Sequence, residues 1–214
     1  ADNPAANTLV GTGTCVAGAV AITPASALAE GNFNFHATET DTAGNTSSNS
    51  GILGVVVIDT SAPGTPAAAP DLTAATDTGT SNTDDITGNN TPDFDVTCTE
   101  AGAVITLYSD NPAANTSVGT HTCTAAGTET ASVSPAIADG AHNITYSETD
   151  TAGNESAQSA PLAVTVDTSA PGTPAAGPDM QAGSDTGTSN TDDITGNNTP
   201  DFDVTCTEAG AVIT

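Results

Sequence analysis

The stretch DTGTSNTDDITGNNTPDFDVTCTEAGAVIT, residues 77–106, decides the fold of this chain because it occurs twice. It returns without a change as residues 185–214, 108 positions further on. A period of this length is too long for a helical solenoid unit and suits one small domain per copy. The sequence therefore predicts a tandem array. The same offset separates three further pairs of landmarks: Cys15 and Cys123, Cys98 and Cys206, Asp59 and Asp167.

Apolar and polar side chains alternate within this stretch. Phe94, Val96 and Cys98 are separated by single polar residues, which is the period of a β-strand with one buried face. Roughly seven short strands, with turn residues every ~8 to 12 positions, are typical of an immunoglobulin-like sandwich. We expect the strands of the complete copy within residues 67–76, 94–98, 105–107, 118–123, 128–133, 142–146 and 162–166.

Two proline-containing linkers divide the array. They are DTSAPGTP at residues 59–66 and DTSAPG at 167–172, where proline fixes φ and cannot donate to a strand ladder. The predicted domains are the C-terminal part of one repeat (1–58), a complete repeat (59–166) and the N-terminal part of the next (167–214). The chain begins and ends at nearly the same phase, so we expect a window from a longer periodic polypeptide.

The two partial copies carry their own strand expectations. The third copy should stop after its second strand. In the first copy we expect short strands at 9–15 and 20–22, a row of Phe33, Phe35 and Ala37 on one sheet face, and a closing strand at 52–58.

The charge balance excludes several classes of partner. Lys plus Arg is 0 against 26 Asp plus Glu, giving a formal net charge of −26. Nucleic acids and anionic membrane surfaces need a cationic face, so neither is an expected partner. Because no Lys or Arg is present, neighbouring carboxylates must be kept apart, protonated or neutralised by a metal ion. The simplest alternative is a solvated acidic coat that aids solubility.

No sequence pattern indicates membrane insertion or catalysis. No apolar run approaches the roughly 20 residues of a membrane span. There is no nucleophile with a base at recognisable spacing, no phosphate loop and no HExxH, so we do not expect an enzyme. His142 follows a turn where the first copy has Phe33, which favours a packing role.

A series of short motifs resembles a known family. The motifs, in chain order, are DTSAPGTPA, SNTDDIT, TPDF, EAGAVITLY, ADGAHNITY, TDTAGN and LAVTVDTSAP. They are similar to the bacterial immunoglobulin-like repeats of large surface adhesins and biofilm-associated proteins, over essentially the whole chain. The resemblance implies an all-β sandwich, tandem copies, display outside the cell and often calcium at the joints between domains. Two cysteines per repeat depart from the pattern, since many such adhesins carry few or none.

Four cysteines allow three pairings. Cys98 and Cys123 lie 25 residues apart on neighbouring predicted strands, so a disulfide within the repeat is the simplest choice. Cys15 occupies the phase of Cys123, and Cys206 that of Cys98, so we expect both to pair with neighbouring copies. The alternative is buried free thiols. No Cys/His spacing resembles a zinc motif.

Acidic loops are the second candidate site. In a seven-strand sandwich, the loop after the first strand and the loop 150–154 lie at opposite ends of the domain. Calcium takes 6 to 8 oxygen ligands, and Asp, Asn and carbonyl oxygens suit it. The alternative is that these residues cap turns. The expected ligands are Asp77, Asp84, Asp85 and Asp167 at one end, and Asp59, Asp150 and Asn154 at the other.

Glu148 lies on the same inward parity as His142 and Tyr146. A carboxylate there is either a metal ligand or a residue just beyond the core, and we favour the second interpretation.

Three functions remain open. The first is a stiff spacer in a long extracellular array at the cell surface or in a matrix, with neighbouring copies as end-to-end partners. The second is a filament subunit, in which residues 173–214 complete a sandwich with residues 1–58 of another copy by strand complementation. The third is a glycan- or protein-binding adhesin module, which an aromatic content of 3% disfavours.

Overall fold

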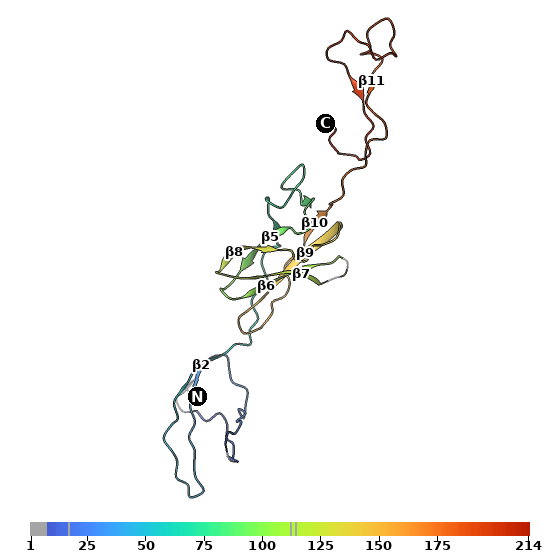
Figure 1. The fold of residues 1–214 in the computed structure, drawn as a ribbon. Coiled ribbons are helices and arrows are strands. Elements are labelled where there is room, and N and C mark those ends of the chain that lie inside the picture. Colours follow the sequence, from blue (N-terminus) through green and yellow to red (C-terminus); the bar gives the residue numbers. More distant parts are fainter. Residues whose placement is uncertain (1–7, 17, 112, 114) are drawn as a thin grey trace. The chain divides into compact units, whose positions relative to one another are not determined.

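The chain is an all-β protein, as expected. The computed structural model describes residues 8–16, 18–111, 113 and 115–214. Within those ranges every regular element is a strand, and none of them is a helix. The chain divides into two compact units, residues 1–166 and 167–214, and the complete repeat belongs to the first (Figure 1).

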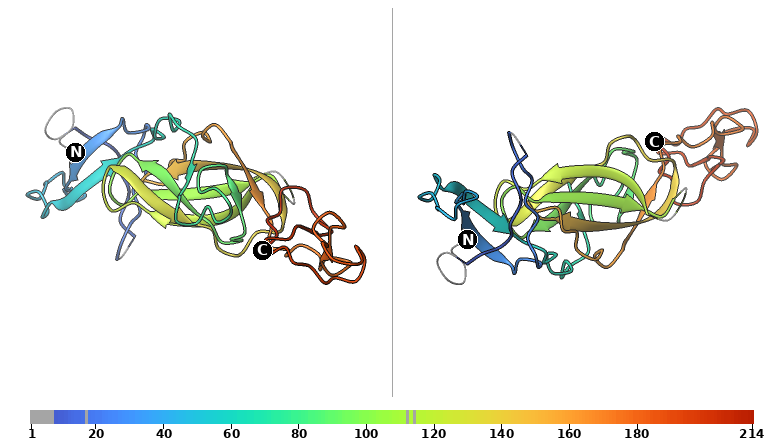
Figure 2. Two further views of the ribbon diagram at one scale, coloured as in Figure 1. Left: turned by 90° about the horizontal axis from the view of Figure 1, so that it is seen from above. Right: turned by 90° about the horizontal axis from the view of Figure 1, so that it is seen from below.

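Two sheets build the complete repeat, and their strands can be followed in Figure 2. The five-stranded sheet has the order β4 (Ile86–Thr87), β10 (Leu162–Val166), β9 (Gly140–Thr149), β6 (Val104–Ser109), β7 (Thr116–Thr122). The three-stranded sheet has the order β3 (Asp71–Leu72), β5 (Asp93–Cys98), β8 (Gly127–Ser132). All pairs are antiparallel except β4 with β10, which is parallel.

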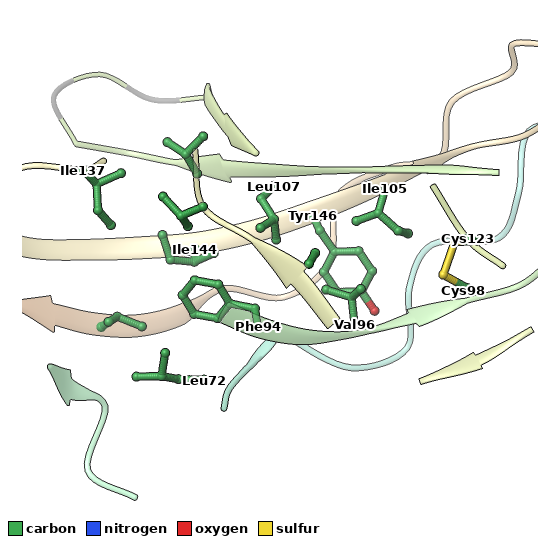
Figure 3. Packing of buried hydrophobic residues seen from close by; sticks show 14 of the residues in the cluster. Leu72, Phe94, Val96, Cys98, Ile105, Leu107, Cys123, Ile137, Ile144 and Tyr146 are labelled. Atoms are coloured by element: carbon green, nitrogen blue, oxygen red, sulfur yellow. A yellow bond between two sulfur atoms is a disulfide. The ribbon is translucent and has the colours of Figure 1, made fainter. Parts of the chain in front are cut away.

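The alternation of apolar residues explains the core. Phe94, Val96 and Cys98 on β5 are at most 2% exposed, and they face the inward residues of β6 and β9 (Figure 3). Tyr146 is fully buried, and its hydroxyl accepts a hydrogen bond from the Thr97 amide at 3.2 Å. The inward side chains of the two sheets therefore pack against one another, and the hydrogen bond of Tyr146 also joins the sheets.

The chain enters the repeat at one end of the sandwich and leaves it at the other. Asn154, in the loop after β9, donates its Nδ2–H to the carbonyl of Asp59 at 3.2 Å, which marks the N-terminal pole. Val166, the last residue of β10, pairs with Gly140 at the start of β9, which marks the C-terminal pole. The two poles are separated by β9, which is ten residues long.

In the first partial copy the described residues form one pair of strands. β1 (Gly31–Phe35) and β2 (Leu53–Ile58) pair antiparallel, and the rings of Phe33 and Phe35 stack with centroids 5.9 Å apart. The strands expected at 9–15 and 20–22 were a wrong prediction, since the described residues there contain none. In the complete copy the two equivalent strands are β7, which pairs with β6, and β8, which pairs with β5, and residues 1–58 hold no equivalent of β5 or β6.

The third copy contains one short strand pair, β11 (Asp179–Met180) with β12 (Phe202–Asp203). Residues 185–214 have the same sequence as residues 77–106 of the complete copy, but their apolar residues are uncovered. Phe202 is 51% exposed, whereas the equivalent Phe94 is 0% exposed. The covering strands, and not the local sequence, therefore decide burial here.

Candidate functional site

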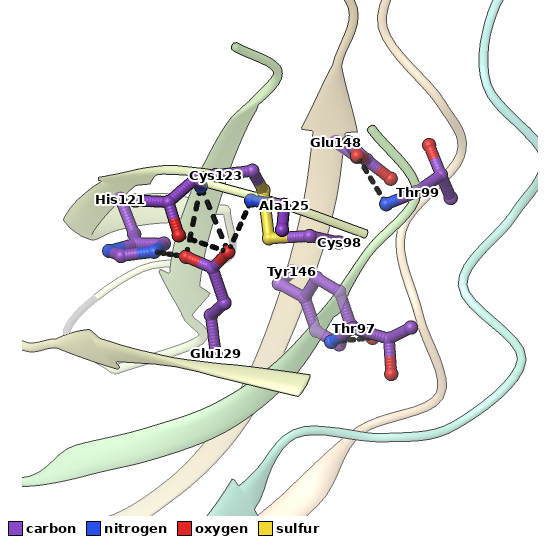
Figure 4. Close-up of a disulfide and its surroundings, with 10 residues drawn as sticks. Thr97, Cys98, Thr99, His121, Cys123, Ala125, Glu129, Tyr146 and Glu148 are labelled. Carbon is purple, nitrogen blue, oxygen red and sulfur yellow. Dashed lines mark hydrogen bonds and ion pairs between the residues drawn. A yellow bond between two sulfur atoms is a disulfide. The ribbon is translucent and has the colours of Figure 1, made fainter. Parts of the chain in front are cut away.

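A disulfide joins the two sheets of the complete repeat. Cys98 ends β5, and Cys123 directly follows β7 in the other sheet. Figure 4 shows the bond and its surroundings. Both residues are 2% exposed. The disulfide is thus a buried covalent link across the sandwich, formed by the two cysteines that belong to one repeat.

An ion pair lies beside the disulfide. His121 Nε2 and Glu129 Oε2 are 2.7 Å apart (Figure 4). Glu129 also accepts hydrogen bonds from the main-chain amides of Thr124 and Ala125. The hydrogen bond with His121, followed by those from the turn, lowers the pKa of Glu129 to about 2. Glu129 is therefore held as a carboxylate against β7.

The other two cysteines are free and exposed in the structure. Cys15 lies in the first partial copy and Cys206 follows β12. Their pairing with neighbouring copies stays a prediction, since it requires a second chain or a further repeat.

An acidic loop occupies the C-terminal pole. The Asp85 carbonyl accepts a hydrogen bond from Thr165 of β10 at 2.8 Å, which fixes the loop against the last strand. Asp77 is 3% exposed, and its Oδ2 accepts the Asp85 amide at 3.3 Å. Its Oδ1 is buried and has no hydrogen-bond partner among the described residues. A buried carboxylate oxygen without a donor is costly, and it is the chemical group that a cation would satisfy.

Asp85 is destabilised as an anion in this loop. Its backbone adopts a φ of 59°, in the left-handed region. Burial raises the pKa of Asp85, and the negative charges of Asp77, Asp71 and Asp84 raise it further, in that order. The structure thus brings Asp77, Asp84 and Asp85 together, with Asp71 as a neighbour that the sequence did not indicate.

The third copy repeats this arrangement. Asp185 is 5% exposed, its Oδ2 accepts the amides of Asp192 and Asp193 at 3.2 Å, and its Oδ1 is again buried without a partner among the described residues. Asp167 begins the second compact unit, where it accepts the Ser169 amide at 3.0 Å. Its place in a joint site stays a prediction.

At the N-terminal pole, residues 150–154 form a hydrogen-bonded turn. Asp150 accepts the amides of Ala152 and Asn154 through Oδ1, and the Asn154 side chain through Oδ2. The hydrogen bond with the Asn154 side chain is the largest cause that lowers the pKa of Asp150. Asp59 uses Oδ1 to accept the Ser61 amide at 3.1 Å. Asp150 therefore caps its turn with both oxygens, while the fold brings Asp150, Asn154 and Asp59 to one pole.

Glu148 is inside the core, so the interpretation that it lies beyond the core was wrong. It is 1% exposed, and its Oε1 accepts the Thr99 amide at 2.8 Å (Figure 4). Its Oε2 has no partner among the described residues. Thr99, the residue after β5, therefore binds the carboxylate through its main-chain amide. The inward parity of Glu148 was the pattern that indicated this position.

His142 packs as expected. It is 2% exposed, with Nε2 at 2.8 Å from the Ala138 carbonyl oxygen and Nδ1 at 2.8 Å from Ser109 Oγ. Both ring nitrogens are engaged, so the imidazole holds the turn before β9 against β6.

The fold of the complete repeat defines the class of this protein, a β-sandwich of the immunoglobulin-like type whose sequence recurs along the chain. Residues 5–60 and 64–168 each match the family described as bacterial Ig-like domain, and the chain belongs to that family. The gap between the two matches falls inside the proline linker at residues 59–66.

The comparisons with solved structures and with curated proteins do not extend this assignment. A solved structure of a "Biofilm associated protein - BSP domain" is similar, with a TM-score of 0.30 and 18% identity, over 70% of this chain and 21% of that one. No curated protein matches. No helix in the described part of the chain is long and apolar enough to cross a membrane.

Proposed function

We propose that this chain is a spacer segment of a bacterial surface adhesin, in which Ig-like repeats joined end to end hold a distant part of the protein away from the cell. Membership of the bacterial Ig-like family supports a structural or adhesive role over catalysis. Display outside the cell agrees with the buried disulfide, because such bonds persist in oxidising compartments.

The observation that carries this proposal is the separation of the two poles. The chain reaches the repeat beside Asn154 and leaves it after Val166, at opposite ends of β9. Ten residues of strand span roughly 33 Å. Each added repeat therefore adds length in one direction, which is what a spacer requires.

X-ray scattering from solutions of two chains tests the proposal. The chain is compared with a version that carries one additional 108-residue period. The maximum dimension should grow by at least ~33 Å, the span of β9 alone. An unchanged maximum dimension would show that repeats fold back on one another, and the spacer proposal would be wrong.

We further propose that calcium stiffens the joints. Asp77, Asp84 and Asp85, with Asp167, would supply oxygen ligands at the C-terminal pole, and Asp59, Asp150 and Asn154 at the N-terminal pole. The buried, partnerless oxygen of Asp77 and its recurrence at Asp185 support the first site. The chain has no Lys or Arg to neutralise that oxygen, and hard oxygen ligands suit Ca²⁺.

Melting with calcium and with a chelator tests this second step. Calcium should raise the melting temperature, since a ligand that binds only the folded state stabilises it. The variant Asp77→Asn should lose that increase. Asp95→Asn is the matched control, because Asp95 lies on β5 with its Oδ1 accepting the Thr130 hydroxyl, a role that an amide oxygen retains. Equal melting temperatures with and without chelator would rule calcium out.

A specific observation also favours strand complementation as an alternative. In β2, Val55 and Val57 are 61% and 63% exposed, whereas the equivalent Val164 and Val166 of the complete copy are 2% and 1% exposed. Apolar strands left this open bind partners that cover them. Residues 173–214 of another copy are the matching half, joined either by a peptide bond or by strand exchange between subunits.

Sedimentation of the purified chain distinguishes the two joins. Strand exchange predicts oligomers that dissociate on dilution and that become cross-linked through Cys206 and Cys15 on oxidation. The variant Cys15→Ser should remove the cross-link and leave the oligomers. A monomer at all concentrations would exclude strand exchange and leave covalent continuation.

A further inference from the structure

We propose that reduction of the Cys98–Cys123 disulfide creates a zinc site, with the two thiolates, the imidazole of His121 and the carboxylate of Glu129 as ligands. The site belongs to the complete repeat and is independent of the acidic poles.

The fold brings these four residues together although the sequence spacing does not resemble a zinc motif. One ligand atom each from Cys98, His121 and Glu129 lies within 4.8 Å of the others. The sulfur of Cys123 is bonded to that of Cys98. Ligand atoms around a tetrahedral zinc ion are roughly 3 to 4 Å apart, given Zn–S of ~2.3 Å and Zn–N of ~2.0 Å. Small side-chain adjustments therefore suffice to surround one ion.

The donor set is the one that zinc prefers. Two thiolates, one imidazole and one carboxylate give four ligands of the types that zinc takes in proteins. The sulfurs are buried, whereas the side chains of His121 and Glu129 are 25% and 15% exposed, so an ion can reach the site from solvent. The hydrogen bonds from Thr124 and Ala125 already orient the carboxylate, as outer ligands do in metal sites.

The first copy does not carry the pair His121 and Glu129 that lies beside the disulfide. Gly13 stands in place of His121 at the 108-residue offset, at which the cysteine is retained as Cys15. After the cysteine the offset is 109, as it is between Gly18 and Gly127, and Val20 stands in place of Glu129. A purely structural role in closing the turn would be needed in each copy that carries the cysteine. The first copy therefore lacks both the imidazole and the carboxylate.

The redox step balances with a dithiol as reductant. The Cys98–Cys123 bond takes up two electrons and two protons, and the two sulfurs of the dithiol form the new disulfide. Zinc then replaces the two thiol protons, which are released to solvent, and the proton between His121 Nε2 and Glu129 is lost where the imidazole becomes a ligand. Oxidation of the two thiolates reverses the sequence and expels the ion.

The test uses the full chain with Cys15→Ser and Cys206→Ser, so that only the two relevant thiols remain. The protein is reduced with a phosphine and titrated with Co²⁺ as a spectroscopic substitute, then with Zn²⁺ against a chelating dye. We expect one ion per chain, a sulfur-to-cobalt charge-transfer band and the strong visible absorption of tetrahedral cobalt. The oxidised chain should bind neither ion at this site.

Three variants identify the ligands. His121→Asn and Glu129→Gln should each weaken zinc binding by at least tenfold, whereas His36→Asn, in the first partial copy, should leave it unchanged. Tyrosine fluorescence, which comes from Tyr108 and Tyr146 of the complete repeat, reports whether each reduced variant is folded. If reduction loosens the repeat, zinc should restore its melting temperature in the reference chain only.

Several outcomes would overturn the proposal. These are the absence of stoichiometric binding after reduction, equal binding by the oxidised chain, or affinities of His121→Asn and Glu129→Gln equal to the reference. The last result would mean that the thiols alone capture metal and that the ion pair only braces the β7–β8 turn.

Discussion

Removing the disulfide is the perturbation whose effect is best defined. The double variant Cys98→Ala/Cys123→Ala deletes a cross-link between residues separated by 25 positions. The loop-closure relation gives a loss of about 3.5 kcal/mol at 25 °C for a loop of that length. An unfolding entropy of roughly 0.23 kcal/mol/K for a repeat of about 108 residues converts this loss to a fall of about 15 °C in melting temperature.

The effect of this double variant can be measured by the fluorescence of the chain's own tyrosines. Its two tyrosines, Tyr108 and Tyr146, both lie in the complete repeat, and there is no tryptophan. Tyrosine fluorescence during urea or thermal unfolding therefore reports that repeat and not the partial copies. Cys15→Ala/Cys206→Ala is the matched control, since those cysteines are free and exposed, and it should leave the midpoint unchanged. A loss below about 1 kcal/mol in the first variant would refute the argument that the bond constrains the unfolded chain.

The remaining predictions concern single side chains. Phe94→Ala should cost about 3–5 kcal/mol in urea unfolding because the ring is fully buried, whereas Phe202→Ala, in an identical stretch of sequence, should have little effect on the same signal. Tyr146→Phe should cost about 0.5–1.5 kcal/mol, the net contribution of one hydrogen bond, since the Thr97 amide of β5 loses its acceptor, and a null result would mean that this amide finds another. Because the pKa of Glu129 in the folded state is about 2, its hydrogen bonds with His121 and the turn stabilise the repeat above the unfolded pKa near 4.5 and are lost as pH falls towards 2. Melting temperatures of the wild type and Glu129→Gln should therefore converge over that acid range, and a constant difference would contradict this.

The strands that could be predicted are those whose pattern and partners both lie in the sequence. Phe94, Val96 and Cys98 alternate with polar residues, and the structure buries all three. The segments 9–15 and 20–22 show similar composition but form no strand among the described residues. A strand is stabilised by its neighbours more than by its own propensity, so pattern alone fails where the neighbour is missing.

The candidate sites could be predicted from the sequence only where the positions of their residues follow from the order of the strands along the chain. The acidic residues at the two poles follow from the order of strands in a sandwich. The contact between His121 and Glu129 does not, because β7 and β8 belong to different sheets and no ladder relates their residues. The hydrogen bond from the Thr99 amide to Glu148 joins residues 49 positions apart, which is likewise a tertiary feature.

The position of the two poles has a consequence for how such a protein changes over time. Because the 30 residues at 77–106 and 185–214 are identical, unequal recombination between them removes or adds one period of 108 residues. Wherever the crossover falls, strand order is restored and no hydrogen-bonded pair is interrupted. The length of the array can therefore change by one repeat at a time, while the fold of each repeat stays the same.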